Sequence, residues 1–311
     1  MKARAFQQID VFTATPYRGN PVAVVLDGSG LSTAEMQHFT HWTNLSECAF
    51  VLPPTEAGRA AGADYRVRIF CPGRELPFAG HPTLGTCHAW LEAGGVPVAA
   101  DVVQECGAGL VRIRREGTFT DGPPPGERTS LRGAATREPA ERGGDARLAF
   151  AAPPLLRSGP LDEADVALIA RGLGIARRDI QAHAWCDNGP TWRGVLLGSA
   201  AQVLALRPDA AVLAGLDVGV IGPHPAGNEA AFEVRAFFPG SGGLTEDPVT
   251  GSLNAALGQW LIAAGLAPAR YVTAQGTVLD RAGRVFVERA ADGTVWVGGQ
   301  SVTCISGQVR L

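Results

Sequence analysis

The chain has 311 residues, of which 46% are hydrophobic and 18% are charged, which is typical of a folded globular protein and excludes a disordered one. Its formal net charge is −3, so the chain as a whole has no positive field that would bind nucleic acid or an anionic membrane. This length suffices for one large domain or two medium-sized domains, each with its own core.

No targeting segment is expected. The first residues include two cations, Lys2 and Arg4, but no apolar run of the kind found in a secretory signal. No part of the chain approaches the roughly 18 uninterrupted apolar residues of a membrane-spanning helix. The six cysteines are scattered without a C-x-x-C pair, as expected for reduced and mostly buried thiols. These features predict a cytoplasmic protein.

The first elements alternate strands with turns and a short helix. We predict strands in AFQQIDVFT and NPVAVVLDG, with a Pro- and Gly-containing turn between them. A helix is expected after Ser32, because Glu35 follows it at the spacing of a capping box. Two more strands are predicted in CAFVLPP and DYRVRIFCP.

A segment without periodicity lies near the middle of the chain. Residues 120–146 are rich in Gly, Pro and Arg, a composition typical of a loop or linker. We therefore predict two domains. The first comprises residues 1–119 together with 298–311, and the second comprises residues 147–297.

The second half repeats a pattern of the first. RIFCPG and RAFFPG, which begin at Arg68 and Arg235, share the pattern Arg-x-Phe-x-Pro-Gly and are interpreted as strands that end in a proline turn. Each is followed by a glycine and an apolar stretch, PTLGTCHAWLEA or LNAALGQWLIAA. The glycines after these stretches, Gly94 and Gly265, suit the left-handed position that ends a helix. Two equivalent apolar helices are therefore predicted.

A helix that is apolar on every side must be buried on every side. Two such helices predict an α/β (α+β) fold with two pseudo-symmetric domains, each a mostly antiparallel sheet wrapped around a central helix. A pseudo-two-fold axis would place the two helix N-termini opposite each other in the cleft between the domains. His81 lies at one of these N-termini and Ser252 at the other. Free N–H groups there would favour an anion such as a substrate carboxylate.

Four segments resemble the phenazine-biosynthesis PhzF-like family, whose fold is similar to that of diaminopimelate epimerase. They are DVFTATPYRGNPVAVVL, NLSECAFVLPP, ELPFAGHPTLGT and GGLTEDPVTGSLNAALG. The segments stand in the family's order, and the resemblance covers nearly the whole chain outside 120–146. It implies a diaminopimelate epimerase-like fold and an isomerase activity, and it also implies a homodimer.

The resemblance places the site residues. It implies that the acid–base carboxylate is Glu47, the histidine His81, the aspartate Asp247 and the serine Ser252. The two residues after Glu47 are Cys48 and Ala49, where the family often has threonines; this departure concerns the substrate more than the chemistry.

Each of these residue types suits a role in proton transfer. A general base that also returns the proton needs a pKa near neutrality, which burial of Glu47 in an apolar cleft would supply. His81 and Asp247 would orient the substrate or share its charge, although Asp247 could also cap the following helix. The residues expected to help bind a carboxylate are Gly80, Gly251 and Ser252.

Other patterns predict no cofactor. The chain contains neither a G-x-x-x-x-G-K nor a G-x-G-x-x-G motif, so nucleotide binding has no support. His38 and His41 could in principle chelate a metal ion, but no third ligand lies nearby in the sequence, and exposed histidines are the preferred interpretation. Cys48 is expected to be a small buried hydrophobic residue.

The two helix starts contain AGHPT and VTGSL, without the cysteine pair that epimerases of this fold use. The sequence therefore predicts a cofactor-independent isomerase in which a single Glu moves a proton between carbons of a small cyclic or unsaturated carboxylic acid. Two alternatives stay open. One is an epimerase or racemase that uses Glu47 with another second base, and the other is a catalytically silent protein that binds small acids. The expected partner is the small carboxylic acid, with neither nucleic acid nor membrane.

Overall fold

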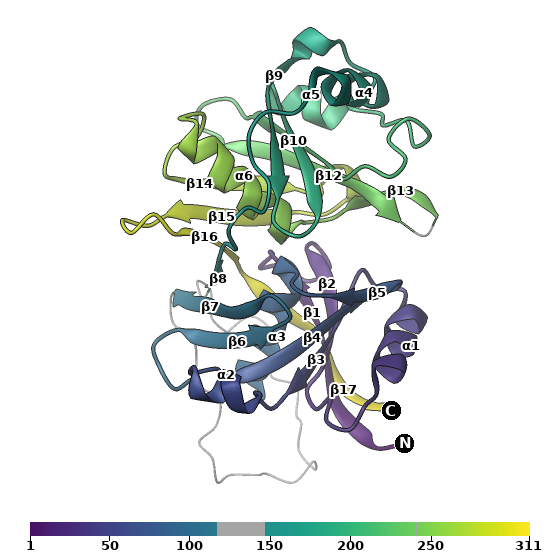
Figure 1. Ribbon diagram of the computed structural model, residues 1–311, viewed down its shortest axis with the longest axis vertical. Helices are drawn as coiled ribbons and strands as arrows, with labels where there is room; N and C mark the ends of the chain where they lie inside the picture. The colour runs from purple at the N-terminus through teal and green to yellow at the C-terminus, as the bar shows by residue number, and fades with distance from the viewer. Residues whose placement is uncertain (117–146, 241) are drawn as a thin grey trace.

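The computed structural model describes residues 1–116, 147–240 and 242–311, so the predicted linker, 120–146, lies outside the described residues. The chain forms two lobes stacked along its longest axis (Figure 1). The first lobe contains α1 (Thr33–Thr43), α2 (Glu56–Ala60), α3 (Gly80–Glu92), β1 (Ala3–Val11), β2 (Asn20–Val25), β3 (Cys48–Leu52), β4 (Tyr65–Cys71), β5 (Arg74–Leu76), β6 (Val102–Cys106) and β7 (Gly109–Glu116).

The second lobe has the same kinds of element in nearly the same order. It contains α4 (Glu163–Leu173), α5 (Ala200–Ala205), α6 (Gly251–Ala263), β9 (Ile180–Asp187), β10 (Thr191–Leu197), β11 (Val218–Pro223), β12 (Phe232–Gly240), β13 (Gly243–Asp247), β14 (Arg270–Gln275) and β15 (Gly283–Arg289), with short 3-10 helices η2 (Arg177–Asp179) and η3 (Thr277–Leu279).

Three further strands join the lobes. β8 (Arg147–Ala151) pairs with β7 on one side and with β16 (Val295–Gly299) on the other, so one sheet runs through the whole molecule. After β16 the chain returns to the first lobe as β17 (Ser301–Arg310), which pairs with β1. Because β8 hydrogen-bonds to strands of both lobes, the start of the second domain at residue 147 remains a proposal.

The sheet is pseudo-symmetric, as predicted. In the first lobe all pairings are antiparallel except β2 with β3 and β4 with β6. The equivalent pairs in the second lobe, β10 with β11 and β12 with β14, are likewise parallel. Each sheet curves around a central helix, α3 or α6 (Figure 1). The expected fold, a mostly antiparallel sheet wrapped around each of two central helices, is therefore confirmed.

The repeated motif aligns the two lobes residue by residue. Arg68 makes two hydrogen bonds to Glu75, at 2.7 and 2.5 Å, and Arg235 makes two to Glu246, at 2.8 and 2.7 Å. Each glutamate stands five residues before the first residue of the central helix. The alignment makes His81 equivalent to Ser252, and Leu76 equivalent to Asp247.

The two central helices begin against each other. A Cβ atom built on Gly80 would lie 2.8 Å from the Cα atom of Gly251, and one built on Gly251 would lie 2.9 Å from that of Gly80. Only glycine allows such a close backbone approach. Each helix then ends as predicted, because Gly94 and Gly265 have positive φ angles of 91° and 69°.

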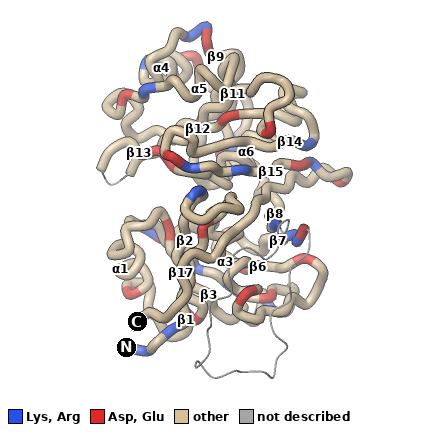
Figure 2. Tube along the Cα trace, turned by 180° about the vertical axis from the view of Figure 1, so that it is seen from behind, with Lys and Arg blue, Asp and Glu red and all other residues tan. Residues whose placement is uncertain are grey.

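The other local predictions agree with the structure. Ser32 caps α1, and Glu35 completes the capping box. In the described residues, no helix is long and apolar enough to cross a membrane. Acidic and basic residues are interspersed along the chain in both lobes, and both chain ends lie in the first lobe (Figure 2). The backbone N–H of Lys2 donates to the carbonyl of Leu311 at 2.6 Å.

Candidate active site

The first side of the candidate site is an acid beside an imidazole. Glu47 lies between α1 and β3, and His81 is the second residue of α3. The Oε2 atom of Glu47 is 3.2 Å from Nε2 of His81, and their side chains are 17% and 5% exposed. The angles are not those of a hydrogen bond, so within the described residues both buried atoms lack a hydrogen-bond partner. A bound molecule could supply partners for both.

Burial sets the protonation of this pair. It raises the pKa of Glu47 well above its usual value, and the negative charge of nearby Asp247 raises it further. Burial also lowers the pKa of His81 to about 3, against the opposing effect of a hydrogen bond with the Pro21 backbone. His81 is therefore a neutral imidazole near pH 7, and Glu47 holds its proton more tightly than an ordinary glutamate.

Asp247 reaches the same region from the second lobe. Its Oδ1 atom accepts a hydrogen bond from Nδ2 of Asn20 at 2.9 Å, and its Oδ2 atom accepts one from Oγ1 of Thr250 at 2.6 Å. Nδ2 of Asn20 is also 3.3 Å from Nδ1 of His81. Burial raises the pKa of Asp247 to about 6, although both hydrogen bonds favour the charged form. Asn20 thus connects the aspartate to the histidine across the lobes.

Asp247 is not the N-cap of α6, which corrects one of the two roles considered for it. The N-cap residue is Thr250, whose side chain makes no capping hydrogen bond. Its backbone N–H donates instead to Oε1 of Gln275, at 3.0 Å, and its hydroxyl accepts from Nε2 of Gln275, at 2.9 Å. This buried amide holds the turn before α6, and with it the carboxylate of Asp247.

The second side of the site surrounds Ser252, the second residue of α6. The indole Nε1–H of Trp192 donates to Oγ of Ser252 at 3.1 Å, and Nδ2 of Asn188 donates to its backbone carbonyl at 2.8 Å. All three residues are at most 7% exposed. The lobes therefore differ chemically at equivalent helix starts: one presents an acid and an imidazole, and the other a hydroxyl held by an indole.

A second acidic residue occupies the position equivalent to Glu47. The strand registers of the lobes correspond, which makes Asp217, directly before β11, the counterpart of Glu47, directly before β3. Oδ2 of Asp217 accepts a hydrogen bond from the backbone N–H of Thr191 at 3.2 Å. Burial raises the pKa of Asp217, against this bond and the charge of Arg193. Among the residues that the structure describes, no hydrogen bond joins Asp217 to Ser252.

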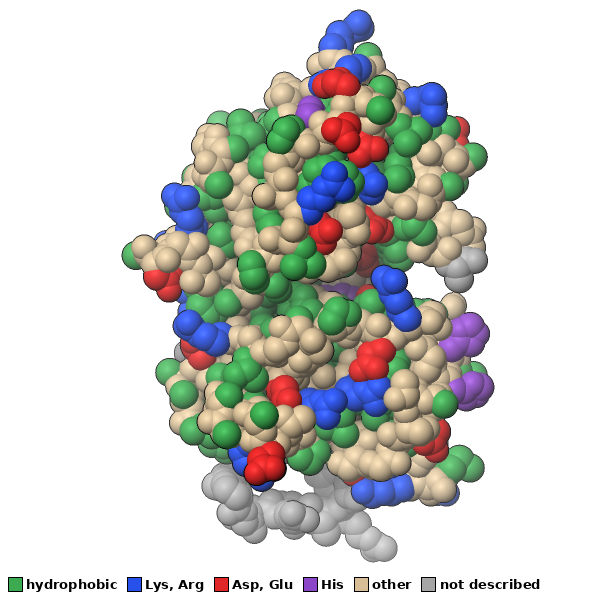
Figure 3. Space-filling view, viewed as in Figure 1, with side chains coloured by type: hydrophobic (Ala, Val, Ile, Leu, Met, Phe, Trp, Pro, Cys, Tyr) green, Lys and Arg blue, Asp and Glu red, His purple; other side chains and the backbone are tan. Residues whose placement is uncertain are grey.

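The helix starts themselves can bind an anion. Neither α3 nor α6 has a side chain that caps its first N–H groups, and the partial positive charges of both helix ends meet where Gly80 and Gly251 touch. A carboxylate placed there would accept hydrogen bonds from these groups. The predicted residues of both lobes thus come together at one place. Figure 3 shows a hollow between the lobes on one face of the molecule.

Several residues of the site were missed by the sequence predictions. They are Asn20, Asn188, Trp192 and Gln275. The only signal was a weak similarity between GNPVAVVL and NGPTWRGVLL, which contain the first three of them. Each of these residues carries a polar group and is buried. Buried polar groups usually belong to a hydrogen-bond network.

His38, His41 and Cys48 lie as the sequence predicts. His38 and His41 are exposed on α1, and Cys48 is a free, buried thiol. Trp42 is 76% exposed and stacks on Phe39. Among the described residues, no three His, Cys, Asp or Glu side chains gather in a way that could hold a metal ion.

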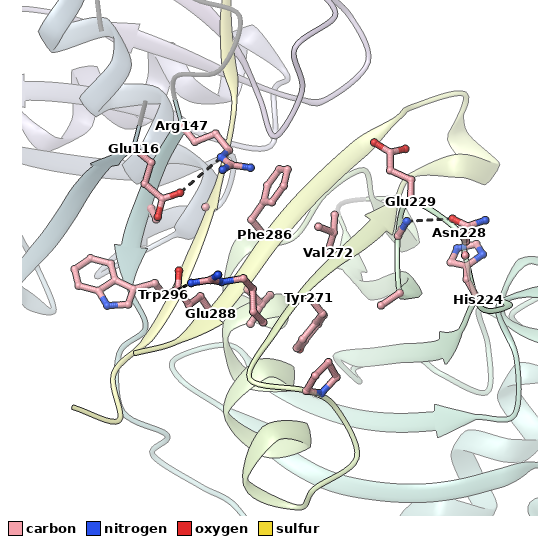
Figure 4. Close-up of a pocket in the computed structure, with 18 of the residues that line it drawn as sticks. Glu116, Arg147, His224, Asn228, Glu229, Tyr271, Val272, Phe286, Glu288 and Trp296 are labelled. Atoms are coloured by element: carbon pink, nitrogen blue, oxygen red, sulfur yellow. Dashed lines mark hydrogen bonds and ion pairs between the residues drawn. The ribbon is translucent and has the colours of Figure 1, made fainter. Parts of the chain in front are cut away.

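A separate hollow of about 830 Å³ lies over β7, β8 and β14 to β16 (Figure 4). Several of its charged side chains pair with one another: Arg114 contacts Glu116 and Glu288, and Arg270 contacts Glu288 at 2.7 Å. The guanidinium of Arg147 lies 4.1 Å from the ring centre of Phe286. We assign this hollow no catalytic role, because the acid–base pair lies elsewhere.

The fold and the site define a class of protein: a two-lobed enzyme of the diaminopimelate epimerase-like type, with a glutamate and a buried histidine where two central helices meet. A family model described as phenazine biosynthesis-like protein (PhzC-PhzF) matches residues 9–307. The chain belongs to this family, as the four segments predicted.

Individual relatives agree with this assignment. The chain is 35% identical to antisense-enhancing sequence 1 of Schizosaccharomyces pombe, covering 99% of each chain. It is 31% identical to the uncharacterized isomerase mll1393 of Mesorhizobium japonicum over 100% of both chains. A trans-2,3-dihydro-3-hydroxyanthranilate isomerase of Pseudomonas aeruginosa is 52% identical over 81 residues, which cover 26% of this chain and 27% of that protein.

A solved structure confirms the fold. The PhzF-family phenazine biosynthesis protein of Bacillus anthracis superposes with a TM-score of 0.75 at 22% identity and covers 100% of both chains. Together with the named isomerases, these matches confirm the expected enzyme class, an isomerase of the PhzF-like type.

Proposed function

We propose that the protein moves a proton between two carbons of a small cyclic or unsaturated carboxylic acid, with Glu47 as both base and acid. The observation that supports this proposal is the contact between Glu47 Oε2 and His81 Nε2. These two buried atoms lack hydrogen-bond partners in the described part of the chain and lie beside two uncapped helix starts. The Pseudomonas relative, named for an isomerisation of a cyclic amino acid, supports the substrate class.

The reaction needs only one proton carrier. The Glu47 carboxylate takes a proton from one carbon, and the electron pair of the broken C–H bond moves into the conjugated system of the substrate. Glu47 then returns the proton to another carbon on the same face, where a new C–H bond forms as the double bond shifts. Its raised pKa suits it to both steps. His81 and Asp247 orient the substrate, and no cofactor is assigned.

The substrate carboxylate would bind at the start of the two central helices. Gly80 and Gly251 permit the close approach of the helices, and Ser252 adds a hydroxyl beside them. Fixed hydrogen-bond donors of this kind stabilise negative charge that spreads into the carboxylate during proton transfer. We also propose a homodimer located in the cytoplasm, with no nucleic acid or membrane partner.

Isotope exchange tests this proposal directly. Wild type, Glu47→Gln and Glu56→Gln are each incubated in deuterated water with trans-2,3-dihydro-3-hydroxyanthranilate, and the products are followed by NMR. Glu56 is exposed on α2 and serves as the matched control. We expect rearrangement with deuterium incorporation in wild type and in the control, and a rate lower by about 10³-fold in Glu47→Gln. Equal rates in all three proteins would contradict the proposal.

The two alternatives predict different outcomes in the same experiment. An epimerase or racemase would incorporate deuterium at a stereocentre and lose optical purity without moving a double bond. Asp217, the counterpart of Glu47, would then be the first residue to examine as the second base. A protein that only binds small acids would bind the acid in wild type and in Glu47→Gln, with no exchange in either.

A further inference from the structure

The hydroxyl of Ser252 is constrained by a neighbour that can act only as a donor. Trp192 is the second residue of β10 and is 4% exposed, and its indole N–H donates to Oγ of Ser252 at 3.1 Å. An indole nitrogen cannot accept a hydrogen bond. The Ser252 proton therefore cannot point toward Trp192, and one of the two lone pairs of its oxygen is occupied.

The Ser252 proton is left available for a ligand. No hydrogen bond donated by the Ser252 hydroxyl is present among the described residues, although the side chain is buried. The backbone carbonyl of Ser252 is also occupied, because Nδ2 of Asn188 donates to it at 2.8 Å. Ser252 thus adds a hydrogen-bond donor beside the uncapped N–H groups of α3 and α6.

We propose that Trp192 is a positioning residue that makes Ser252 a hydrogen-bond donor, so that this part of the site selects a carboxylate over a neutral carboxamide. The inference rests on the proposed function, since it concerns the substrate carboxylate. A carboxylate can accept from every donor at this place, whereas the NH₂ group of a carboxamide would face these donors and find at Ser252 only the one lone pair that Trp192 leaves free. Val22 is the residue of the first lobe at the equivalent strand position, so this indole is a feature of the second lobe alone.

A matched pair of ligands separates this role from simple packing. Anthranilate and anthranilamide differ only in carboxylate against carboxamide, and their dissociation constants are measured by calorimetry for wild type, Trp192→Phe and Trp260→Phe. The control residue lies on α6, near the other end of the same helix. We expect the preference for the acid to fall by about 10-fold in Trp192→Phe alone, because the Ser252 hydroxyl, no longer held by the indole, can turn so that its oxygen accepts from the amide. Equal weakening of both ligands would overturn the inference.

A measurement without ligand tests the hydrogen bond itself. The indole N–H signal of Trp192 is identified in ¹H–¹⁵N spectra by its loss in Trp192→Phe. We expect Ser252→Ala to shift this signal and speed its exchange with water, while Trp260→Phe leaves it in place. An unchanged signal in Ser252→Ala would overturn the inference. If wild type binds neither ligand while the indole responds as expected, the proposed function is contradicted and the hydrogen bond is supported.

Discussion

Glu47 and Asp247 are two acids in one desolvated region, and each has a raised pKa for the same principal reason, burial. Their environments nevertheless differ. Asp247 accepts hydrogen bonds from Asn20 and Thr250, whereas Oε2 of Glu47 has no hydrogen-bond partner among the described residues. Hydrogen bonds favour the charged form, so Asp247 ionises first and Glu47 keeps its proton to higher pH. In the proposed mechanism, this order assigns the negative charge to Asp247 and the transferred proton to Glu47.

The pH dependence of catalysis should report this order. We expect kcat/KM to rise with pH as Glu47 loses its proton, with a midpoint well above the usual value for a glutamate. In Asp247→Asn the midpoint should move to lower pH, because the neighbouring negative charge that raises the pKa of Glu47 is gone. Initial rates between pH 4 and 9 provide the measurement. A midpoint that moves upward would contradict the assigned coupling.

Stability should depend on pH through Asp247 in a defined direction. Its folded pKa of about 6 exceeds the ordinary value of 3.8, so the folded state holds this proton more tightly than the unfolded state. The stabilisation of the folded state by this proton is therefore fully present below pH 3.8 and is lost as the pH rises through 6. The loss lowers the free energy of unfolding by about 3 kcal/mol. Urea unfolding at pH 3.5 and 7.5 should show that Asp247→Asn lacks this loss; an identical pH dependence in both proteins would argue against it.

At the scale of elements, the contact between α3 and α6 leaves no room for a side chain. A methyl group at Gly80 would lie within 2.8–2.9 Å of Gly251 backbone atoms. We expect Gly80→Ala to lower the free energy of unfolding by about 1–3 kcal/mol, through forced separation of the helices. Gly73→Ala is the control, because nothing lies within 4 Å of its added methyl group. Chemical denaturation of both variants is the test, and equal stabilities would be inconsistent with the tight contact.

The elements that depend on local sequence were predictable. The capping box of α1 and the glycines after α3 and α6 depend only on residues a few positions away in the sequence. The repeated motif that predicted two lobes is likewise confined to a short segment of each half. The apolar character of α3 and α6 also predicted their burial. Glu47, His81, Asp247 and Ser252 came from a family resemblance carried by short segments.

The hydrogen-bond partners of these residues were not predictable. Asn20 meets Asp247 across 227 positions of sequence, and Trp192 meets Ser252 across 60. Such pairs depend on strand register and on how the lobes face each other, which no local pattern encodes. The same reason explains why Asp247 does not cap α6. Its position in the sequence, just before the helix, suggested a cap, whereas in the folded protein its carboxylate accepts a hydrogen bond from Asn20.

At the scale of the whole molecule, the lobes are held by more than one connection. β8 and β16 continue the sheet from one lobe into the other, and Arg281 donates from the second lobe to the carbonyls of Tyr17 and Gly19 in the first. The helix starts also touch at their glycines. These connections indicate that the site between the lobes is a fixed part of the folded protein.

Cooperative unfolding should follow from these connections. We expect the central amides of α3 and α6 to exchange with solvent only through global unfolding, and therefore with the same free energy. Native-state hydrogen exchange across a series of denaturant concentrations measures both helices in one experiment. A clearly lower free energy for one helix would mean that its lobe opens independently, contrary to this expectation.

The unequal helix starts have a consequence for how such an enzyme can acquire new specificity. The two lobes repeat one arrangement of strands around a central helix, and the first has His81 where the second has Ser252. Selection can therefore alter recognition in the second lobe while Glu47 and His81 in the first are preserved. Mutant libraries confined to Asn188, Trp192 and Ser252 should yield altered substrate ranges with far fewer inactive members than libraries that include Glu47 and His81.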